Sequence, residues 1–275
     1  MMDRRITPAN TRVAAEELRG QVDAENYNTG TPMRVIAPVA DILATPGGKR
    51  DRQILMGQAV RVFELHDGYA YLQSLRDGYC GYVAKAALGA DFETTHWVTA
   101  PASHLYAEAD FKSPDHALLC LGAELRIVET TDKYGKTHDG FWVPLQHIAP
   151  LDFRFDDPAM VAESLLGTDY LWGGNSRSGL DCSALVQAAF QACGVTIPGD
   201  SDLQEKGLAP GKPMGNTPER NDLMFWKGHV ALVLDEQTLI HANAGAMAVV
   251  REGIAEAIAR IETQGDGPVT SRIRL

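Results

Sequence analysis

Cys182 is the residue whose type and position most clearly predict chemistry, because it stands in the first turn of a predicted helix. Apolar residues follow it at intervals of three and four, the pattern of a helix that buries one face. Asp181 occupies the expected N-cap position, and Gly194 stands where the helix should end. Unpaired backbone N–H groups and the positive end of the helix dipole favour a thiolate in this turn. Cys182 is therefore a candidate nucleophile.

The alternative for Cys182 is a packing role, since free cysteine is among the most buried residue types. The preceding stretch, YLWGGNSRSGLD, favours chemistry because its glycines and serines predict an irregular loop, and such loops often carry function. Cys80, Cys120 and Cys193 are assigned to structure, since none of them is predicted to begin a helix. The cysteines show no CxxC spacing, which argues against a disulfide framework and against a metal site of the zinc type.

A cysteine nucleophile needs a base, and only His229 and His241 follow Cys182 in the chain. They lie in HVALVLDEQTLIHAN, where two apolar runs enclose the polar DEQT and predict a β-hairpin. If Val233 pairs with Gln237, His229 lies directly opposite His241, with Cβ atoms about 5 Å apart. A lone histidine would more simply be a hydrogen-bonded strand residue. Two facing histidines instead favour a base and its orienting group, as acyl transfer requires.

These motifs carry a resemblance to a known family. The run YLWGGNSRSGLDCSALVQ, followed by NDLMFW, GHVALVL and LIHAN, resembles the NlpC-type cysteine peptidases, a papain-like group that cleaves peptides of the bacterial cell wall. The resemblance covers about residues 158–275. It implies that Cys182 is the nucleophile, His229 the base and His241 the orienting residue.

Two positions depart from the family's usual pattern. Ala184 follows the DCS where glycine is usual, and Asn221 precedes the DL where glycine is also usual. Neither change removes a catalytic atom, so both are interpreted as tolerated backbone changes that could reshape the mouth of the site.

Several residues near the nucleophile are candidates for contacts with the substrate. Tyr170 could donate to the developing oxyanion beside the backbone N–H of Cys182. Trp172 is expected to form the floor of the groove. Asp181 and Ser183 match positions that contact substrate in the family, although Asp181 could equally be a plain N-cap.

Candidates for binding the substrate's free amine lie further away. Asp200 and Ser201 match the loop that lines the family's groove, and Asp200 could pair with an ammonium group. Tyr79 is the candidate for a tyrosine that the N-terminal half contributes to the site. An aromatic packing role inside a β-barrel is an equally good interpretation of Tyr79.

The N-terminal half contains a weak internal repeat of about sixty residues. APVADIL is echoed by APASHLY, LMGQAVRVFE by CLGAELRIVE, and DGYCGYVAKAAL by DGFWVPLQHI. Short β-rich runs broken by glycine, proline and aspartate predict two copies of one small barrel. These copies resemble bacterial SH3-like domains, which commonly precede NlpC-type catalytic domains.

The predicted fold class is therefore α+β, with a papain-like catalytic domain preceded by two small SH3-like β-barrels. The predicted divisions are an N-terminal extension (1–30), a first barrel (31–91), a second barrel (92–152) and the peptidase domain (153–275). The extension is expected to form a short helix over 11–19 that ends at Gly20. In the peptidase domain, EGIAEAIARIET predicts an amphipathic helix that packs through Ile254, Ile258 and Ile261.

Composition excludes some partners. The 275 residues carry a net charge of −11, which argues against nucleic acid and anionic surfaces. No apolar run has the features of a signal peptide or of a membrane span, so a cytoplasmic protein without a membrane partner is expected.

The resemblance implies hydrolysis of the γ-D-glutamyl–diamino acid bond of murein peptides with a free N-terminal L-Ala, which releases L-Ala-γ-D-Glu. It implies a role in murein-peptide recycling, with no metal, organic cofactor or obligate protein partner. Three alternatives stay open: an amidase or acyltransferase, an endopeptidase acting on another wall peptide, and a non-catalytic wall-peptide-binding protein. The diamino acid, diaminopimelate or lysine, is also open.

Overall fold

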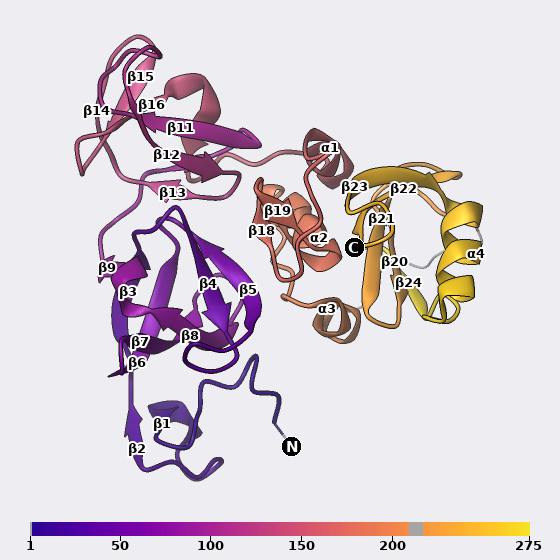
Figure 1. Ribbon diagram of the computed structural model, residues 1–275, viewed down its shortest axis with the longest axis horizontal. Helices are drawn as coiled ribbons and strands as arrows, with labels where there is room; N and C mark the ends of the chain where they lie inside the picture. Colours follow the sequence, from indigo (N-terminus) through magenta and orange to yellow (C-terminus); the bar gives the residue numbers. More distant parts are fainter. Residues whose placement is uncertain (1, 209–216) are drawn as a thin grey trace. The chain divides into compact units, whose positions relative to one another are not determined.

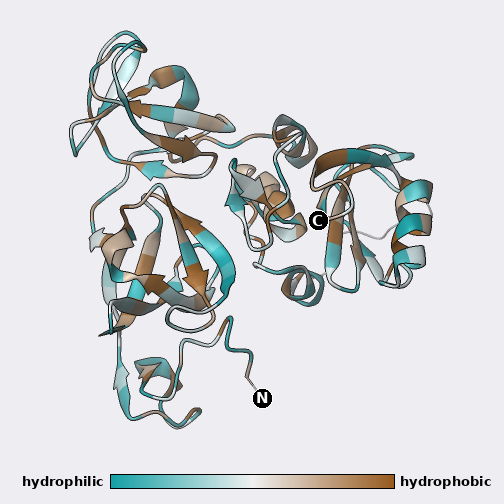
Figure 2. Cartoon of the chain, in the orientation of Figure 1, coloured by the Kyte–Doolittle hydropathy of each residue, from teal (hydrophilic) through white to brown (hydrophobic). Residues whose placement is uncertain are grey.

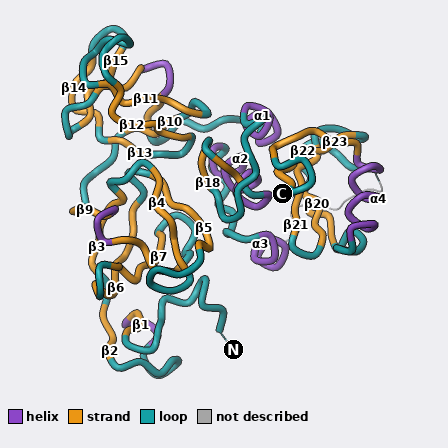
Figure 3. Tube along the Cα trace, in the orientation of Figure 1, coloured by secondary structure: helices purple, strands orange, loops and turns teal. Residues whose placement is uncertain are grey.

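The computed structural model describes residues 2–208 and 217–275, and its contacts divide the chain into two compact units, Met1–Phe153 and Arg154–Leu275. The N-terminal unit is built of strands and short 3-10 turns (Figure 1). Every α-helix among the described residues belongs to the C-terminal unit, and the short helical segments of the N-terminal unit in Figure 3 are 3-10 turns. The predicted α+β class is therefore confirmed.

The first barrel is a seven-stranded sheet in the order β5-β4-β8-β7-β6-β3-β9. Its hairpin between β6 and β7 turns at Asp67 and Gly68, which both have positive φ (48° and 80°), as a type I′ turn requires. The elements are β3 (Thr31–Val35), β4 (Val39–Leu43), β5 (Arg50–Leu55), β6 (Ala59–His66), β7 (Tyr69–Ser74), β8 (Cys80–Ala84), the 3-10 turn η2 (Lys85–Ala87) and β9 (Leu88–Ala90).

The next segment repeats this plan strand for strand. Its strands form two sheets, in the orders β12-β11-β16-β15-β14 and β13-β10-β17. Together these sheets have the strand order of the first barrel, with β13 and β14 at the position of β6. The predicted repeat is thus confirmed by the topology. The elements are β10 (His96–Val98), β11 (Ala102–Tyr106), β12 (Asp115–Cys120), β13 (Glu124–Leu125), β14 (Ile127–Thr130), β15 (Tyr134–Thr137), β16 (Trp142–Pro144), the 3-10 turn η3 (Leu145–His147) and β17 (Ile148–Pro150).

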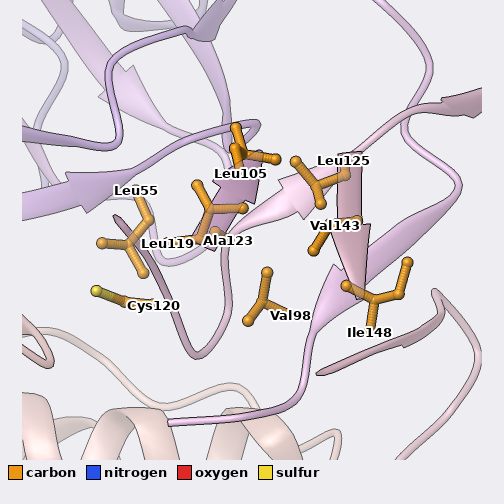
Figure 4. Close-up of a cluster of buried hydrophobic side chains, with 9 residues drawn as sticks. All are labelled: Leu55, Val98, Leu105, Leu119, Cys120, Ala123, Leu125, Val143 and Ile148. Atoms are coloured by element: carbon orange, nitrogen blue, oxygen red, sulfur yellow. The ribbon is translucent and has the colours of Figure 1, made fainter. Parts of the chain in front are cut away.

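The two copies share a core within their unit. Leu55, from the first copy, belongs to the same buried cluster as Leu119 and Val143 of the second (Figure 4). Beside it, the backbone N–H of Glu124 donates to the carbonyl of Met56 at 2.8 Å. A side chain at Gly57 would collide with the Glu124 carbonyl, so this close approach needs glycine.

The predicted helix over 11–19 is wrong. Val13–Ala15 is a strand, β1, paired in parallel with β2 (Asn26–Asn28), and only Glu16–Leu18 forms a 3-10 turn, η1. Val13 and Ala15 are buried with aromatic residues of the first barrel, so tertiary packing overrides the local helical preference.

The C-terminal unit is built on a five-stranded sheet in the order β23-β22-β21-β20-β24. A short hairpin of β18 and β19 precedes α2, which packs against α1, β21 and β22. The strands are β18 (Asn175–Ser176), β19 (Gly179–Leu180), β20 (Leu223–Trp226), β21 (His229–Val233), β22 (Thr238–Asn243), β23 (Ala248–Gly253) and β24 (Ser271–Ile273). The helices are α1 (Pro158–Ser164), α2 (Cys182–Ala192), α3 (Ser201–Gly207) and α4 (Ile254–Gln264).

Helix α4 covers the sheet through its apolar side, as predicted. Ile254 and Ile261 are buried in a cluster with strand residues Ala231 and Val233, and Ile258 packs against that cluster. Figure 2 shows the corresponding alternation of hydrophobic and hydrophilic residues along α4. None of the helices formed by the described residues has both the length and the apolar character that a bilayer span requires.

The C-terminal strand is held by a buried carboxylate. Asp222 is fully buried, and Arg274 donates to both of its oxygens, Nε to Oδ1 at 2.6 Å and Nη2 to Oδ2 at 2.8 Å. Burial alone would raise the pKa of Asp222, but the bonds from Arg274 hold this pKa below its usual value.

We expect Asp222→Asn to lower the free energy of unfolding by about 3 kcal/mol, because it breaks a buried ion pair. The exposed Asp266 provides a matched control, and Asp266→Asn should change stability by less than about 0.5 kcal/mol. Urea denaturation of both variants measures the difference. Equal midpoints for the two variants would contradict the assigned role of Asp222.

Candidate active site

Cys182 is the first residue of α2, and Asp181 is its N-cap, as predicted. One oxygen of Asp181, Oδ1, accepts from the backbone N–H of Ala184 and from the hydroxyl of Ser183, both at 2.8 Å. The other oxygen accepts from the backbone N–H of Gly173 at 3.0 Å. Asp181 therefore fixes both the helix start and the preceding glycine loop.

Burial acts against the predicted preference of Cys182 for the thiolate in the protein without substrate. Burial, and secondly the charge of Asp181, raise the pKa of this thiol to about 12. Backbone N–H groups of Val230, Ser183 and Cys182 itself act in the opposite direction but do not outweigh burial. A neutral thiol must therefore lose its proton to a base when it reacts.

The sheet brings histidines to this helix start. The N–H of Val230, which lies at the sulfur of Cys182, belongs to the residue directly after His229. In the adjacent strand β22, Nδ1 of His241 lies 2.9 Å from Nε2 of His229. The far nitrogen of His229 is thus held by His241, and Nδ1 of His229 is the atom left to act as a base.

The hairpin register differs from the predicted one. Val233 pairs with Leu239 and not with Gln237. The turn is longer because Oδ1 of Asp235 accepts from the backbone N–H groups of Gln237 and Thr238, at 2.9 and 2.8 Å, and stabilises a wider loop.

The histidines nevertheless share one face of the sheet. The observed register differs from the predicted one by two residues, and a shift by two leaves each side chain on its original face. His229 and His241 therefore meet diagonally, with ring centroids 5.1 Å apart, instead of directly across the hairpin.

Burial favours the neutral form of both imidazoles. Burial lowers the pKa of His229 to about 3, with His241 as the second cause, and lowers the pKa of His241 to about 4. A neutral His229 can accept a proton, whereas a protonated one could not.

A further pair at this site was not predicted from the sequence. Oε2 of Glu252 lies 2.9 Å from Nε2 of His241, and Arg260 donates to both oxygens of Glu252. Glu252 is in β23 and Arg260 in α4. No sequence signal could have found them, because only the register between β22 and β23 brings Glu252 to His241.

Comparison with known proteins agrees with this geometry. The NlpC/P60 family matches residues 167–262, which include the cysteine and both histidines. This match lies within the C-terminal unit, which therefore contains an NlpC/P60 domain. The bacterial dipeptidyl-peptidase SH3 domain matches residues 42–88, within the first barrel.

Three curated relatives of the chain are named dipeptidyl-peptidases. Dipeptidyl-peptidase 6 of Lysinibacillus sphaericus is 27% identical over 77% of this chain and 87% of its own length. The γ-D-glutamyl-L-lysine dipeptidyl-peptidase of Bacillus subtilis is 28% identical over 60% of each chain. The Bacillus cereus protein of that name is 33% identical over 39% of this chain and 34% of its own length. Together with the family match, these relatives make the protein a cysteine peptidase.

A solved structure shares the fold along most of the chain. An NlpC/P60 family protein from Bacillus cereus covers 89% of this chain and 99% of its own, with a TM-score of 0.74 at 18% identity. The chain layout of SH3-like barrels before an NlpC/P60 domain is thus found in a known protein.

Within the NlpC/P60 domain, Tyr170 is a neighbour of the cysteine. Its backbone N–H donates to the carbonyl of Met247 at 2.9 Å. Burial, and secondly the adjacent Cys182, raise the pKa of Tyr170, so its hydroxyl keeps its proton and can donate. Its role at the oxyanion stays a prediction.

The remaining predicted residues are spread over several elements. Ser183 is buried in the first turn of α2, Asp200 is the N-cap residue of α3, and Ser201 is the first residue of α3. Trp172, in the glycine loop, is 70% exposed, so its ring is accessible to solvent. Substrate contacts by these residues stay predictions.

Tyr79 lies in the N-terminal unit directly before β8. It is fully buried, and the guanidinium of Arg52 lies 5.4 Å from the centre of its ring. This environment agrees with the packing interpretation, and a contribution to the catalytic groove stays a prediction.

The two departures from the family pattern have structural explanations. Asn221 has a φ of 73°, a left-handed conformation that asparagine tolerates better than most residues. Its Oδ1 also accepts from the backbone N–H of Ala159 at 2.9 Å, a contact that glycine could not make. Ala184 is buried in the first turns of α2, where alanine is a better helix former than glycine.

The lowered pKa of His241 predicts a loss of stability in acid. Between about pH 6.5 and its folded-state pKa of about 4, the unfolded chain binds a proton at this residue that the folded chain does not. Stability should therefore fall as the pH is lowered through this window, by up to about 1.4 kcal/mol per pH unit from His241 alone.

Urea denaturation of wild type and His241→Gln across this pH range tests the effect. The variant should show a shallower decline below about pH 6.5 and the same slope as wild type above about pH 7. Parallel curves throughout would show that His241 is not held neutral by burial.

If Tyr170 stabilises the oxyanion, Tyr170→Phe should lower kcat by about 100-fold with little change in KM, because the lost bond forms only in the transition state. Steady-state hydrolysis of a wall peptide measures both constants, and thermal unfolding checks that the variant folds. A kcat within about twofold of wild type would show that Tyr170 does not stabilise the oxyanion.

Proposed function

We propose that this cysteine peptidase hydrolyses the γ-D-glutamyl–diamino acid bond of cell-wall peptides with a free N-terminal L-Ala and releases L-Ala-γ-D-Glu. The observation that carries the proposal is the bond between Nε2 of His229 and Nδ1 of His241 beside the helix that begins with Cys182. The names of the relatives support the choice of substrate, since two of them are γ-D-glutamyl-L-lysine dipeptidyl-peptidases.

In the first half of the reaction, the sulfur of Cys182 attacks the γ-carbonyl carbon of D-glutamate while its proton passes to Nδ1 of His229. The backbone N–H of Cys182 and the hydroxyl of Tyr170 donate to the oxyanion. The imidazolium of His229 then gives its proton to the departing amine of the diamino acid, which leaves a thioester on Cys182.

In the second half, His229 takes a proton from water, and the resulting hydroxide attacks the thioester carbonyl. The thiolate of Cys182 leaves and regains the proton from His229, which frees L-Ala-γ-D-Glu and restores both neutral groups. His241 holds the ring of His229 through both halves by the 2.9 Å bond.

The free amine of the substrate needs a negative partner. Asp181 is 8% exposed and accepts three bonds that hold the helix start and the glycine loop, so its carboxylate is committed to structure. Asp200, the N-cap residue of α3, is the proposed partner for the ammonium group, with Ser201 beside it.

The proposal extends to the place of action. SH3-like barrels before a peptidase domain resemble the layout of cytoplasmic enzymes that act on free wall peptides during murein recycling. This resemblance supports a cytoplasmic recycling enzyme.

The test is mass spectrometry of L-Ala-γ-D-Glu-L-Lys, its diaminopimelate counterpart and N-acetylated copies of both, incubated with the purified chain. Wild type should release L-Ala-γ-D-Glu from the free-amine peptides, and acetylation should slow release by at least about 100-fold, because it removes the charge that Asp200 binds. The preferred diamino acid is read from the same data.

Cys182→Ala should abolish release, because it removes the thiol that forms the thioester. Cys193→Ala is the matched control and should retain activity, since Cys193 lies at the opposite end of α2. Equal cleavage of acetylated and free peptides would point to an endopeptidase or amidase. Release by Cys182→Ala would refute the mechanism.

A further inference from the structure

A chain of hydrogen bonds continues from the histidine pair to the surface of the NlpC/P60 domain. Nε2 of His241 lies 2.9 Å from Oε2 of Glu252. Arg260 then binds both oxygens of Glu252, with Nε 2.9 Å from Oε1 and Nη2 2.7 Å from Oε2. The side chain of His241 is fully buried, that of Glu252 is 19% exposed and that of Arg260 is 30% exposed.

We propose that Glu252 and Arg260 are positioning residues that set the tautomers of both histidines. The inference rests on the proposed function in one respect, since it takes His229 as the base. Neither residue touches the reacting atoms, so both would act through His241.

The chemistry of each group determines which ring nitrogen of each histidine carries the proton. An ionised carboxylate can only accept, so Nε2 of His241 must carry the proton that meets Glu252. Nδ1 of His241 is then a lone pair, and it accepts from Nε2–H of His229. This leaves Nδ1 of His229 without a proton, which is the state that can take the proton of Cys182.

Asn243 competes for the same nitrogen. Its amide nitrogen lies 2.8 Å from Nε2 of His241, and its Oδ1 accepts from the backbone N–H of Ala246 at 2.8 Å. If Asn243 donated to Nε2, His241 would carry its proton on Nδ1, and the proton of His229 would move to the nitrogen needed by the thiol. A charge-assisted bond is about twice as strong as a neutral one, so Glu252 decides the tautomer.

Arg260 keeps Glu252 in the form that this argument requires. Its paired bonds are the largest cause that holds the pKa of Glu252 below its usual value. The carboxylate therefore stays ionised, and its negative charge also stabilises the imidazolium that forms on His229 during the reaction.

The chain offers a matched control next to Glu252. Arg251 precedes it in β23, so its side chain points to the opposite face of the strand. Its side chain is 55% exposed and pairs with Glu163 at 2.7 Å. Arg251→Gln removes the same charge as Arg260→Gln without touching the histidines.

The decisive measurement is the tautomeric state of His229 and His241, read from the nitrogen chemical shifts of ¹⁵N-histidine-labelled full-length protein near neutral pH. In wild type, both should carry the proton on Nε2. In Glu252→Gln the negative charge is lost, so the bond to Nε2 of His241 is no stronger than the bond that Asn243 can donate to the same atom. The Nδ1–H tautomer of both histidines should then appear. Signals are assigned from His229→Gln and His241→Gln.

Kinetics provide the second measurement. Glu252→Gln should lower kcat by about 10- to 100-fold with KM within about twofold, because the substrate is not contacted. Arg260→Gln should lower kcat less, and Arg251→Gln should match wild type.

Two results would overturn the inference: a proton on Nδ1 of His241 in wild type, or unchanged tautomers and kcat in Glu252→Gln. The first does not depend on the folding of Glu252→Gln. Inactivity of wild type on every γ-D-glutamyl peptide would instead refute the proposed substrate, and the tautomers would still decide the role of Glu252.

Discussion

The candidate active site depends on the hydrogen bond between His229 and His241. It orients the ring of His229 so that its other nitrogen is available to the thiol, and it exists only because two neighbouring strands place both rings on one face. The packing of α2 against β21 then brings the start of the helix to the start of the strand. One helix and two strands of the sheet thus bring Cys182 together with His229 and His241.

Burial determines how charge is distributed at this site. The thiol of Cys182 and the two imidazoles are all shifted toward their neutral forms, because the charged forms would lose solvation. The charged groups around them, Asp181 and the Glu252–Arg260 pair, are bound by hydrogen bonds from the backbone or from each other. Burial therefore favours a thiol on Cys182 and a neutral imidazole on His229 before the reaction, and the proton passes from one to the other during it.

The N-terminal unit contains two copies of one strand arrangement. The second copy splits the strand equivalent to β6 at Arg126, so its strands form two sheets where the first copy forms one. The copies are joined by a shared apolar cluster and by the close backbone approach at Gly57. Such an interface makes the pair a single folded unit.

The sequence by itself determined the features that rest on local signals. The N-cap at Asp181, the helix that starts at Cys182 and ends before Gly194, the existence of the histidine hairpin and the barrel repeat all follow from short-range patterns. Tertiary structure alone decided the hairpin register, the strand at Val13–Ala15, the neutral thiol and the contact between Glu252 and His241. Each of these depends on burial or on pairing between distant segments, and spacing along the chain carries no measure of either.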